Sequence, residues 1–251
     1  MDYLAEYMES SVDRATDELC GSVEDDRFDQ IFPSRLRKLS SLYWTPVVVA
    51  SHAAKLLARK PGTRVLDIGC GPGKFCLIAA ALTDGQFTGI EQRADLAKAA
   101  KDAALKERLN NIEIIHGNVT NLSFSRYDAF YLFNPFEENM FENLSIDRSV
   151  PFSRDLYIKY VKYVAAELRA KPIGTPVVTY AGSAREVPMC YNCHLSSFGG
   201  DLKLWIKVHE PVPNDAQFGR IRYRSRRIAR NRFFSKLGKS RNLRTRDAQR
   251  L

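Results

Sequence analysis

Three glycines at alternate positions, Gly69, Gly71 and Gly73, follow a short apolar run that begins at Val65. An apolar run of this length that ends in glycines is typical of a buried strand, and residues 74–82 read as a helix. Glycine is needed where the backbone adopts a positive φ or passes close to a ligand. Such a turn aims the free N–H groups of the following helix at whatever lies beyond the strand end. The segment therefore predicts a strand–turn–helix unit with a ligand site at the turn.

Two common ligand-binding turns do not fit this segment. A P-loop, G-x-x-x-x-G-K-[ST], would need glycine in place of Ile68 and Ser or Thr in place of Phe75. A dinucleotide-binding turn requires G-x-G-x-x-G, but Lys74 stands at the position of its last glycine. The remaining pattern is an acid, Asp67, two residues before G-x-G-x-G.

This pattern resembles the first motif of the class I S-adenosylmethionine-dependent methyltransferases. The resemblance implies that S-adenosylmethionine is the cofactor and that Asp67 contacts its amino group, directly or through water. Glu91 ends the next predicted strand, where a carboxylate can accept from both ribose hydroxyls. Asn118 stands where the family often has an acid near the adenine. The alternative is a Rossmann-like turn that binds another nucleotide or no ligand. The residues that the resemblance assigns to the cofactor are Tyr43, Thr45, Asp67, Gly69, Cys70, Gly71, Gly73, Glu91, Gln92, Asn118, Val119 and Asn134.

The end of the fourth predicted strand carries Asn134-Pro135-Phe136. It resembles the N-P-P-[YF] motif of methyltransferases that modify planar amino groups. In that motif the asparagine and a backbone carbonyl accept from the target NH2, and the aromatic ring stacks on the target. The resemblance implies catalytic roles for Asn134, Pro135 and Phe136, which would act by positioning the acceptor. This chain has one proline in place of two. In the alternative interpretation Asn134 caps the loop and Phe136 packs over the cofactor.

A second motif, Tyr43-Trp44-Thr45-Pro46, lies upstream of the glycine turn. It resembles an aromatic-x-T-P element that covers the cofactor in two groups, the adenine amino methyltransferases and a set of non-SET protein-lysine methyltransferases. The element therefore does not choose the acceptor. Thr45 and Pro46 are also a good helix start, since threonine is a frequent N-cap and proline is tolerated at the first helical position. We expect this helix to end before Pro61.

Strand and helix patterns alternate along most of the chain. They predict strands at 64–69, 86–91, 112–117, 127–133 and 176–181, and helices at 74–82, 95–109 and 153–170. Alternating apolar residues predict an antiparallel hairpin between 202–208 and 221–223. The fold expected is α/β, with a doubly wound, mostly parallel seven-stranded sheet, helices on both faces and an antiparallel C-terminal hairpin. The expected domain limits are an acidic, partly helical extension at 1–41, a methyltransferase domain at 42–225 and a basic tail at 226–251.

Charge is distributed unevenly along the chain, whose formal net charge is +9. Residues 1–30 hold ten acids and two bases, and residues 220–251 hold thirteen Lys or Arg and one acid. Guanidinium groups with interleaved aromatic rings suit RNA or DNA backbones and exposed bases. We therefore expect an RNA or DNA partner through residues 220–251. The alternatives are ion pairing of this tail with the acidic arm and a solvated end.

Five cysteines are too few for a disulfide framework, which favours a cytoplasmic setting. Residues 190–194 match the haem-attachment pattern C-x-x-C-H, but the acidic N-terminus does not resemble an export signal. One C-x-x-C also gives too few ligands for a closed zinc site, so we expect idle cysteines at Cys190 and Cys193, beside His194, and no metal. The longest apolar run, 75–82, is too short to span a membrane.

The function expected from these motifs is methyl transfer from S-adenosylmethionine, and the favoured acceptor is an amino nitrogen of a nucleic-acid base. A protein lysine is the alternative acceptor. A non-catalytic module that binds the cofactor, and RNA through its basic end, is the alternative of another class.

Overall fold

The computed structural model describes residues 20–136, 139, 146–147, 150–151, 153–182 and 184–211. The segment at 221–223, which was predicted to be a strand, and the basic tail lie outside these residues, as does the start of the acidic arm. The chain divides into residues 1–212 and 213–251, and the fold described below belongs to the first unit.

A seven-stranded sheet with the order β3-β2-β1-β4-β5-β7-β6 forms the centre of this unit. Its first five strands are parallel, and β7 is antiparallel to both β5 and β6. This confirms the predicted fold class. The strands are β1 Arg64–Ile68, β2 Gln86–Glu91, β3 Ile112–His116, β4 Ala129–Phe133, β5 Pro176–Tyr180, β6 Tyr191–Ser197 and β7 Leu202–Lys207. The helices are α2 Cys20–Phe28, α3 Ser34–Arg37, α4 Ser40–Tyr43, α5 Val47–Leu57, α6 Lys74–Leu82, α7 Ala94–Lys106 and α8 Arg154–Arg169, with 3-10 turns η1 Asp29–Ile31, η2 Val119–Asn121 and η5 Phe198–Gly200.

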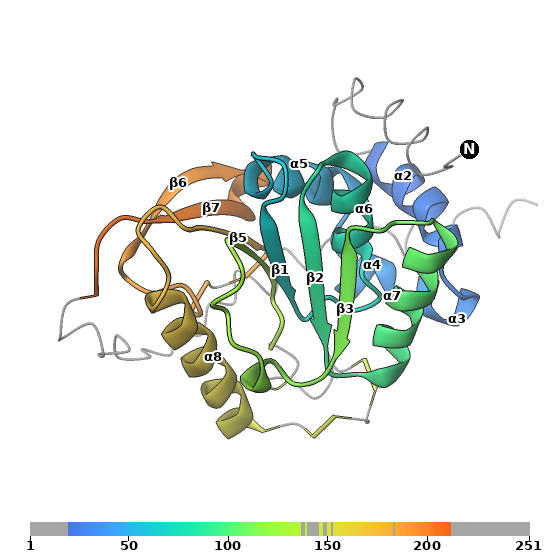
Figure 1. The fold of residues 1–251 in the computed structure, drawn as a ribbon. Coiled ribbons are helices and arrows are strands. Elements are labelled where there is room, and N and C mark those ends of the chain that lie inside the picture. Colours follow the sequence, from blue (N-terminus) through green and yellow to red (C-terminus); the bar gives the residue numbers. More distant parts are fainter. Residues whose placement is uncertain are drawn as a thin grey trace, which may run out of the picture. The chain divides into compact units, whose positions relative to one another are not determined.

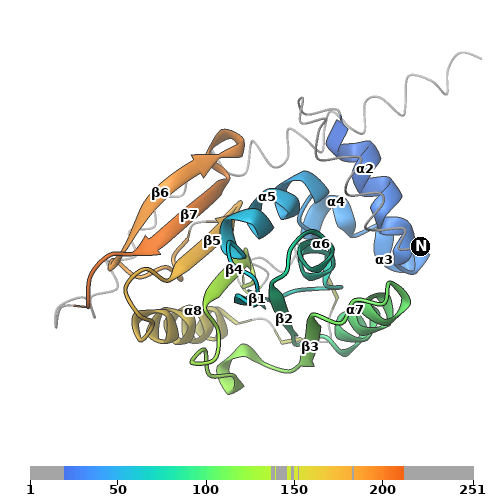
Figure 2. The same ribbon diagram turned by 45° about the horizontal axis from the view of Figure 1, so that its top comes forward.

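Helices cover both faces of the sheet, as Figures 1 and 2 show. One apolar core joins α5, α6 and α7 to one face, and includes Ala53, Leu77 and Ala100. The other core lies beneath α8 and includes Val164 and Leu168. Burial of both faces is the physical reason why the parallel strands read as continuous apolar runs. No helix among the described residues is long and apolar enough to cross a bilayer.

The segment before α5 packs against the sheet-covering helices. Phe28 and Phe32 are almost fully buried and belong to the same core as Val47 and Phe75. The rings of Phe32 and Trp44 pack edge to face, with their centroids 5.0 Å apart. Burial of such rings contributes strongly to stability. The domain limit expected after residue 41 stays a prediction, but the core is continuous across it.

The antiparallel hairpin forms between β6 and β7, so the predicted pairing of 202–208 with 221–223 is wrong for β7. Tyr191 pairs with Lys207, and the register shifts between Cys193 and Leu195. Strand β6 was not predicted because its exposed residues 192–194 are polar or small and break the apolar alternation. Pairing with β7 makes β6 a strand in spite of its sequence, because backbone hydrogen bonds form regardless of side-chain type.

Candidate functional site

The predicted site residues come from segments that meet at one edge of the sheet. The strand β1 leads into the glycine turn, β2 ends at Glu91, β4 ends at Phe133 and β5 ends at Tyr180. These four strands are parallel neighbours in the order β2-β1-β4-β5, so their carboxyl ends lie side by side. Ligands of open α/β sheets bind outside the carboxyl ends of the strands.

The glycine turn needs its glycines for two different reasons. Gly69, Gly71 and Gly73 all have positive φ, at 74°, 56° and 80°, where other residues are strained. A Cβ on Gly69 would stand only 2.9 Å from Cβ of Pro135, so the turn lies directly against the loop after β4. Among the described residues, a Cβ on Gly71 would come within 4 Å of one atom, Cδ1 of Trp44, at 4.0 Å. Gly69 is exposed and Gly71 is partly exposed, so the backbone of the turn has access to solvent at both glycines.

The carboxylate of Glu91 closes the turn. Its Oε2 accepts from the backbone N–H of Gly71 at 3.0 Å, and its Oε1 accepts from the N–H of Arg93 at 2.8 Å. The residue is only 6% exposed. A carboxylate offers about four lone-pair sites, so Glu91 can hold the turn and still accept from hydroxyl groups of a ligand.

The acid before the turn, Asp67, is buried, and no cationic side chain among the described residues pairs with it. The Cys76 thiol lies 3.5 Å from its Oδ2 and is a weak donor. Burial raises the pKa of Asp67 to about 8, and the nearby Glu91 carboxylate raises it further, while the Cys76 thiol acts in the opposite direction. A buried carboxyl of this kind is suited to a cationic ligand, which would restore its charged form.

Thr45 does not cap α5, so the predicted helix start is wrong in its detail. The helix begins at Val47 after Pro46 and has no side-chain cap at that position. The Thr45 hydroxyl instead lies 2.8 Å from the Tyr131 hydroxyl in β4, and both residues are buried. This hydrogen bond joins the segment before α5 to the strand whose end carries Asn134.

Trp44 lies beside the turn but is not among the residues predicted to bind the cofactor, although its neighbours Tyr43 and Thr45 are. Its ring faces Gly71 across the open side of the turn, while Tyr43 is half-buried. The Trp44 Nε1 is buried and has no hydrogen-bond partner among the described residues. A buried donor without a partner is costly, and a ligand over the turn could accept from it. Its position inside the aromatic-x-T-P element was the available signal.

Asn118 has its side chain engaged within the protein. Its Oδ1 accepts from the backbone N–H and hydroxyl of Thr120, and its Nδ2 donates to the Tyr160 hydroxyl at 2.9 Å. The next residue, Val119, is buried. These bonds fix the chain as it leaves β3, beside Glu91 in the adjacent strand. An adenine contact by Asn118 stays a prediction.

Two other residues were assigned to the cofactor, Cys70 within the turn and Gln92 just after β2. The Cys70 thiol is buried against Gly89, where even a Cβ would stand 2.6 Å from the sulfur, and burial raises its pKa well above the usual value. Gln92 is half-buried after β2, and its carbonyl oxygen lies 3.2 Å from Nε2 of His116. Of the two, only Gln92 has a side chain with access to solvent.

Asn134 is held in one orientation at the end of β4. It has a positive φ of 42°, and its Nδ2 donates to the Ala181 carbonyl at 2.6 Å. A Cβ on Gly182 would overlap the Asn134 Oδ1, so the amide fits closely against this glycine. Strained backbone of this kind costs about 1–3 kcal/mol and clusters at functional sites. The amide is thus oriented by β5, with Oδ1 left to accept.

Phe136 lies in the core beneath α8. It is 5% exposed, and its ring centroid is 5.3 Å from that of Tyr160. Its carbonyl oxygen accepts from the backbone N–H and the Nδ2 of Asn139. This packing places the Phe136 ring in the protein core, and packing of the ring over the cofactor, the alternative interpretation, also stays a prediction. Stacking of Phe136 on an acceptor stays a prediction.

A different pair of rings is partly exposed beside Asn134. Phe133 and Tyr180 are register partners at the ends of β4 and β5, with ring centroids 5.0 Å apart. Partial burial, together with the nearby carboxylates of Asp201 and Asp25, raises the pKa of Tyr180 to about 12. The hydroxyl therefore stays protonated near neutral pH and can donate. Strand pairing brought these rings together, so sequence reasoning could not select them.

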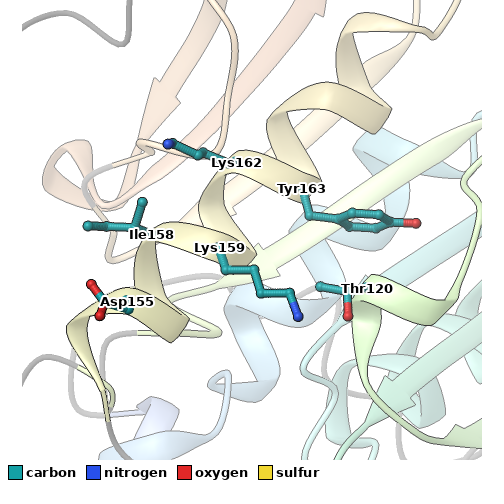
Figure 3. Close-up of a pocket in the computed structure, with 6 residues that line it drawn as sticks. All are labelled: Thr120, Asp155, Ile158, Lys159, Lys162 and Tyr163. Atoms are coloured by element: carbon teal, nitrogen blue, oxygen red, sulfur yellow. The ribbon is translucent and has the colours of Figure 1, made fainter.

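An open groove of about 560 Å³ lies apart from this edge, on the outer side of α8. In Figure 3 Lys159 points toward Thr120, while Lys162 points to the other side. No residue assigned to the cofactor or the acceptor lines it; the lining is Thr120, Asp155, Ile158, Lys159, Lys162 and Tyr163. The two cysteines of the C-x-x-C-H segment also lie in different surroundings. Cys190 is buried in the α8 core, and Cys193 is exposed on β6.

The edge as a whole fits a small polar ligand with a cationic end. It offers the solvent-accessible backbone at Gly69 and Gly71 and the buried carboxyl of Asp67. It also offers the indole N–H of Trp44, which has no hydrogen-bond partner among the described residues. Glu91 adds acceptor capacity on the β2 side. The oriented amide of Asn134 lies across the turn, because Pro135 touches Gly69.

Residues 59–147 match a protein-family model described as a methyltransferase domain. A demethylmenaquinone methyltransferase of Listeria monocytogenes serotype 4a is 28% identical over 130 residues, which are 49% of this chain and 50% of that protein. A 23S rRNA (uracil(1939)-C(5))-methyltransferase of a Shewanella strain is 33% identical over 72 residues, 29% of this chain and 16% of that protein. A solved RNA methyltransferase of Salinibacter ruber, in complex with S-adenosyl-L-homocysteine, is 20% identical with a TM-score of 0.46, and the match covers 65% of this chain and 94% of that one. The chain spans about half the length of the demethylmenaquinone methyltransferases that it matches.

Proposed function

We propose that this chain, whose residues 59–147 match a family model described as a methyltransferase domain, transfers the methyl group of S-adenosylmethionine to an amino nitrogen of a nucleic-acid base. The observation that carries the proposal is the contact between the two halves of the site. Gly69 of the cofactor turn lies directly against Pro135, and the amide of Asn134 precedes it. An acceptor bound at Asn134 therefore lies beside a cofactor bound at the turn.

Asp67, Trp44 and Glu91 are the residues that would hold the cofactor. When bound, S-adenosylmethionine would supply a methyl group on a sulfonium, from which a neutral thioether is a good leaving group. Asp67 receives the cationic amino end, and Glu91 accepts from hydroxyl groups while it holds Gly71 in place. The chain then has to orient the acceptor, since positioning supplies much of the catalysis in such a transfer.

The amide of Asn134 orients the acceptor amino group. Because Nδ2 is committed to the Ala181 carbonyl, Oδ1 is the atom that accepts from the target N–H. This hydrogen bond turns the nitrogen lone pair toward the methyl group. Phe133 and Tyr180 provide a partly exposed aromatic surface beside Asn134 on which a flat base can stack.

A lysine amino group is the second candidate acceptor, and the burial of Phe136 favours it. The ring that stacks on planar targets in the N-P-P-[YF] motif is here 5% exposed and packed on Tyr160. A lysine side chain needs no stacking ring, so the same Asn134 would serve it. Demethylmenaquinone is the acceptor named for the Listeria relatives, and this chain matches about half of the length of those proteins.

Transfer of labelled methyl groups from S-adenosylmethionine to RNA, DNA and protein fractions of the source cell tests the proposal. We expect label in an RNA or DNA fraction, in a base that carries an exocyclic amino group. If the label appears only in protein, the acceptor is a lysine and not a nucleic-acid base. Tight cofactor binding without label in any fraction would favour the non-catalytic module.

Cofactor binding is expected to release a proton from Asp67 at pH 7. The carboxyl has a pKa of about 8 in the free chain and is therefore mostly protonated. A bound ammonium favours the charged form and lowers this pKa below 7, so the proton leaves. Calorimetry of S-adenosylhomocysteine binding in phosphate and in Tris should show heats that differ by the buffers' ionisation enthalpies. The Asp67→Asn variant should show no such difference, and equal heats for the native chain would contradict the assignment of Asp67.

The basic tail is proposed to bind nucleic acid without sequence preference, in the cytoplasm. Residues 220–251 hold thirteen positive charges, more than the acidic arm can neutralise. Binding through phosphates releases counterions and weakens steeply with salt, with typical non-specific dissociation constants near 10⁻⁴–10⁻⁶ M, roughly micromolar. Deletion of residues 226–251 should remove most of the binding to a fluorescent single-stranded oligonucleotide and leave cofactor affinity unchanged. Full binding by the truncated chain would exclude the tail as the contact.

A further inference from the structure

Lys74, the first residue of α6 after the glycine turn, is fully committed to the N-terminal segment. Its side chain is 2% exposed, and its Nζ donates to Asp25 at 2.7 Å, to Asp29 at 2.8 Å and to the Ser40 hydroxyl at 3.2 Å. An ammonium has three donors, and all three are satisfied. A buried charge is tolerated only with such partners. The lysine therefore holds α2, η1 and α4 against the start of α6 and does not face a ligand.

Asp25 makes a second contact, to the start of a different helix. The same Oδ1 that accepts from Lys74 also accepts from the backbone N–H of Val47 at 2.9 Å. The helix α5 has no cap of its own, since the Thr45 hydroxyl is paired with Tyr131. A carboxylate from 22 residues upstream thus supplies the missing cap.

The two helices whose starts Asp25 joins each follow a segment that borders the proposed cofactor site. These two segments, called the two walls of the site, are Trp44 before α5 and the turn at Gly71 before α6. The Trp44 Cδ1 lies 4.0 Å from the Cβ position of Gly71. The start of α6 follows Gly73, which has a positive φ and gives no side-chain cap. Neither wall is held by a capping side chain of its own helix.

We propose that Asp25 is a positioning residue for the cofactor, which sets the gap between Trp44 and the glycine turn by binding Val47 and Lys74 together. This inference rests on the proposed function, because it concerns the site of S-adenosylmethionine. The residue lies outside the matched region 59–147. The N-terminal segment is therefore part of the cofactor site of this chain, and docking of α2 is coupled to cofactor affinity.

Calorimetric titration of S-adenosylhomocysteine into the full chain and its variants tests the coupling. Asp25→Ala should weaken binding at least about tenfold, which corresponds to about 1.4 kcal/mol, because both helix starts lose their common partner. Asp25→Asn should lie between Asp25→Ala and the native chain, because the amide oxygen still accepts from Val47 but carries no charge for Lys74. The matched control is Asp26→Ala, since Asp26 is the exposed neighbour on α2, and it should bind like the native chain.

A second control separates positioning from general loss of stability. Leu168→Ala opens the core beneath α8, on the opposite face of the sheet, and should lower the melting temperature without weakening binding by the folded chain. If Asp25→Ala and Asp25→Asn bind as tightly as the native chain, or if Leu168→Ala weakens binding as much as they do, the inference is wrong while the proposed function stands. Absence of binding by the native chain would overturn the proposed function itself. Should Asp25→Ala not fold, the expected intermediate affinity of Asp25→Asn decides the question.

Discussion

Replacement of Asn134 by alanine is expected to lower the turnover of methyl transfer at least about a hundredfold while cofactor affinity changes little. The side chain is held by the Ala181 carbonyl and leaves Oδ1 for the acceptor. Without it the acceptor loses the group that orients its lone pair, and small misplacements cost about 10²-fold in rate. Single-turnover transfer of labelled methyl, together with calorimetry of the cofactor, measures the two quantities separately.

Two further variants sharpen this prediction. Gly182→Ala places a Cβ where the Asn134 Oδ1 now lies, so it should displace the amide and lower turnover without removing it. Asn110→Ala removes an exposed asparagine after α7 and should change neither quantity. An equal loss of turnover and of cofactor affinity in Asn134→Ala would mean that the residue supports the cofactor and not the acceptor.

Glu91→Ala is expected to weaken cofactor binding by about 1–3 kcal/mol, the cost of losing charge-assisted hydrogen bonds. This corresponds to roughly a 5- to 150-fold rise in the dissociation constant. Two losses combine, because the carboxylate accepts from the backbone N–H of Gly71 in the turn and, in the proposed function, from hydroxyl groups of the cofactor. Calorimetric titration of S-adenosylmethionine gives the affinity.

The control for Glu91 is a carboxylate on the neighbouring strand. Glu113 of β3 is half exposed and pairs with Arg126 at the surface, where an ion pair contributes about 0–1 kcal/mol, so Glu113→Ala should leave affinity unchanged. Glu91→Gln keeps an acceptor for Gly71 and should lose less affinity than Glu91→Ala. Native affinity in Glu91→Ala would remove this residue from the cofactor site.

The strand–turn–helix unit around Asp67 was predictable because its determinants are local. Apolar runs buried on both faces appear directly in the sequence, and β1, α6 and β2 begin or end within one residue of the expected positions. The positive φ angles at Gly69, Gly71 and Gly73 follow from residue type. Helix α8 was equally clear from its apolar spacing, and in the structure the Ser153 side chain caps it by accepting from the N–H groups of Asp155 and Leu156.

The errors at Thr45 and in the hairpin share a physical cause. Thr45 has the intrinsic preference of a cap, but a buried hydroxyl of Tyr131 lies within its reach in the folded chain. The residues of β6 lack strand periodicity. They form a strand because their backbone pairs with the edge of β7 that β5 does not occupy. In both places a tertiary partner outweighs a local preference of a few tenths to about 1 kcal/mol.

Residue type and spacing were sufficient to predict the mostly parallel sheet, the glycine turn and the order in which Asp67, Glu91 and Asn134 reach its edge. Which side chains complete the site depends on contacts between residues far apart in the chain. Asp25 reaches both Val47 and Lys74, Tyr180 lies beside Phe133, and Phe136 turns into the α8 core. These contacts have no sequence period, since they arise only when strand order and helix packing bring the residues together. Local propensity acts over a few residues, whereas packing acts on every pair of surfaces that the fold brings into contact.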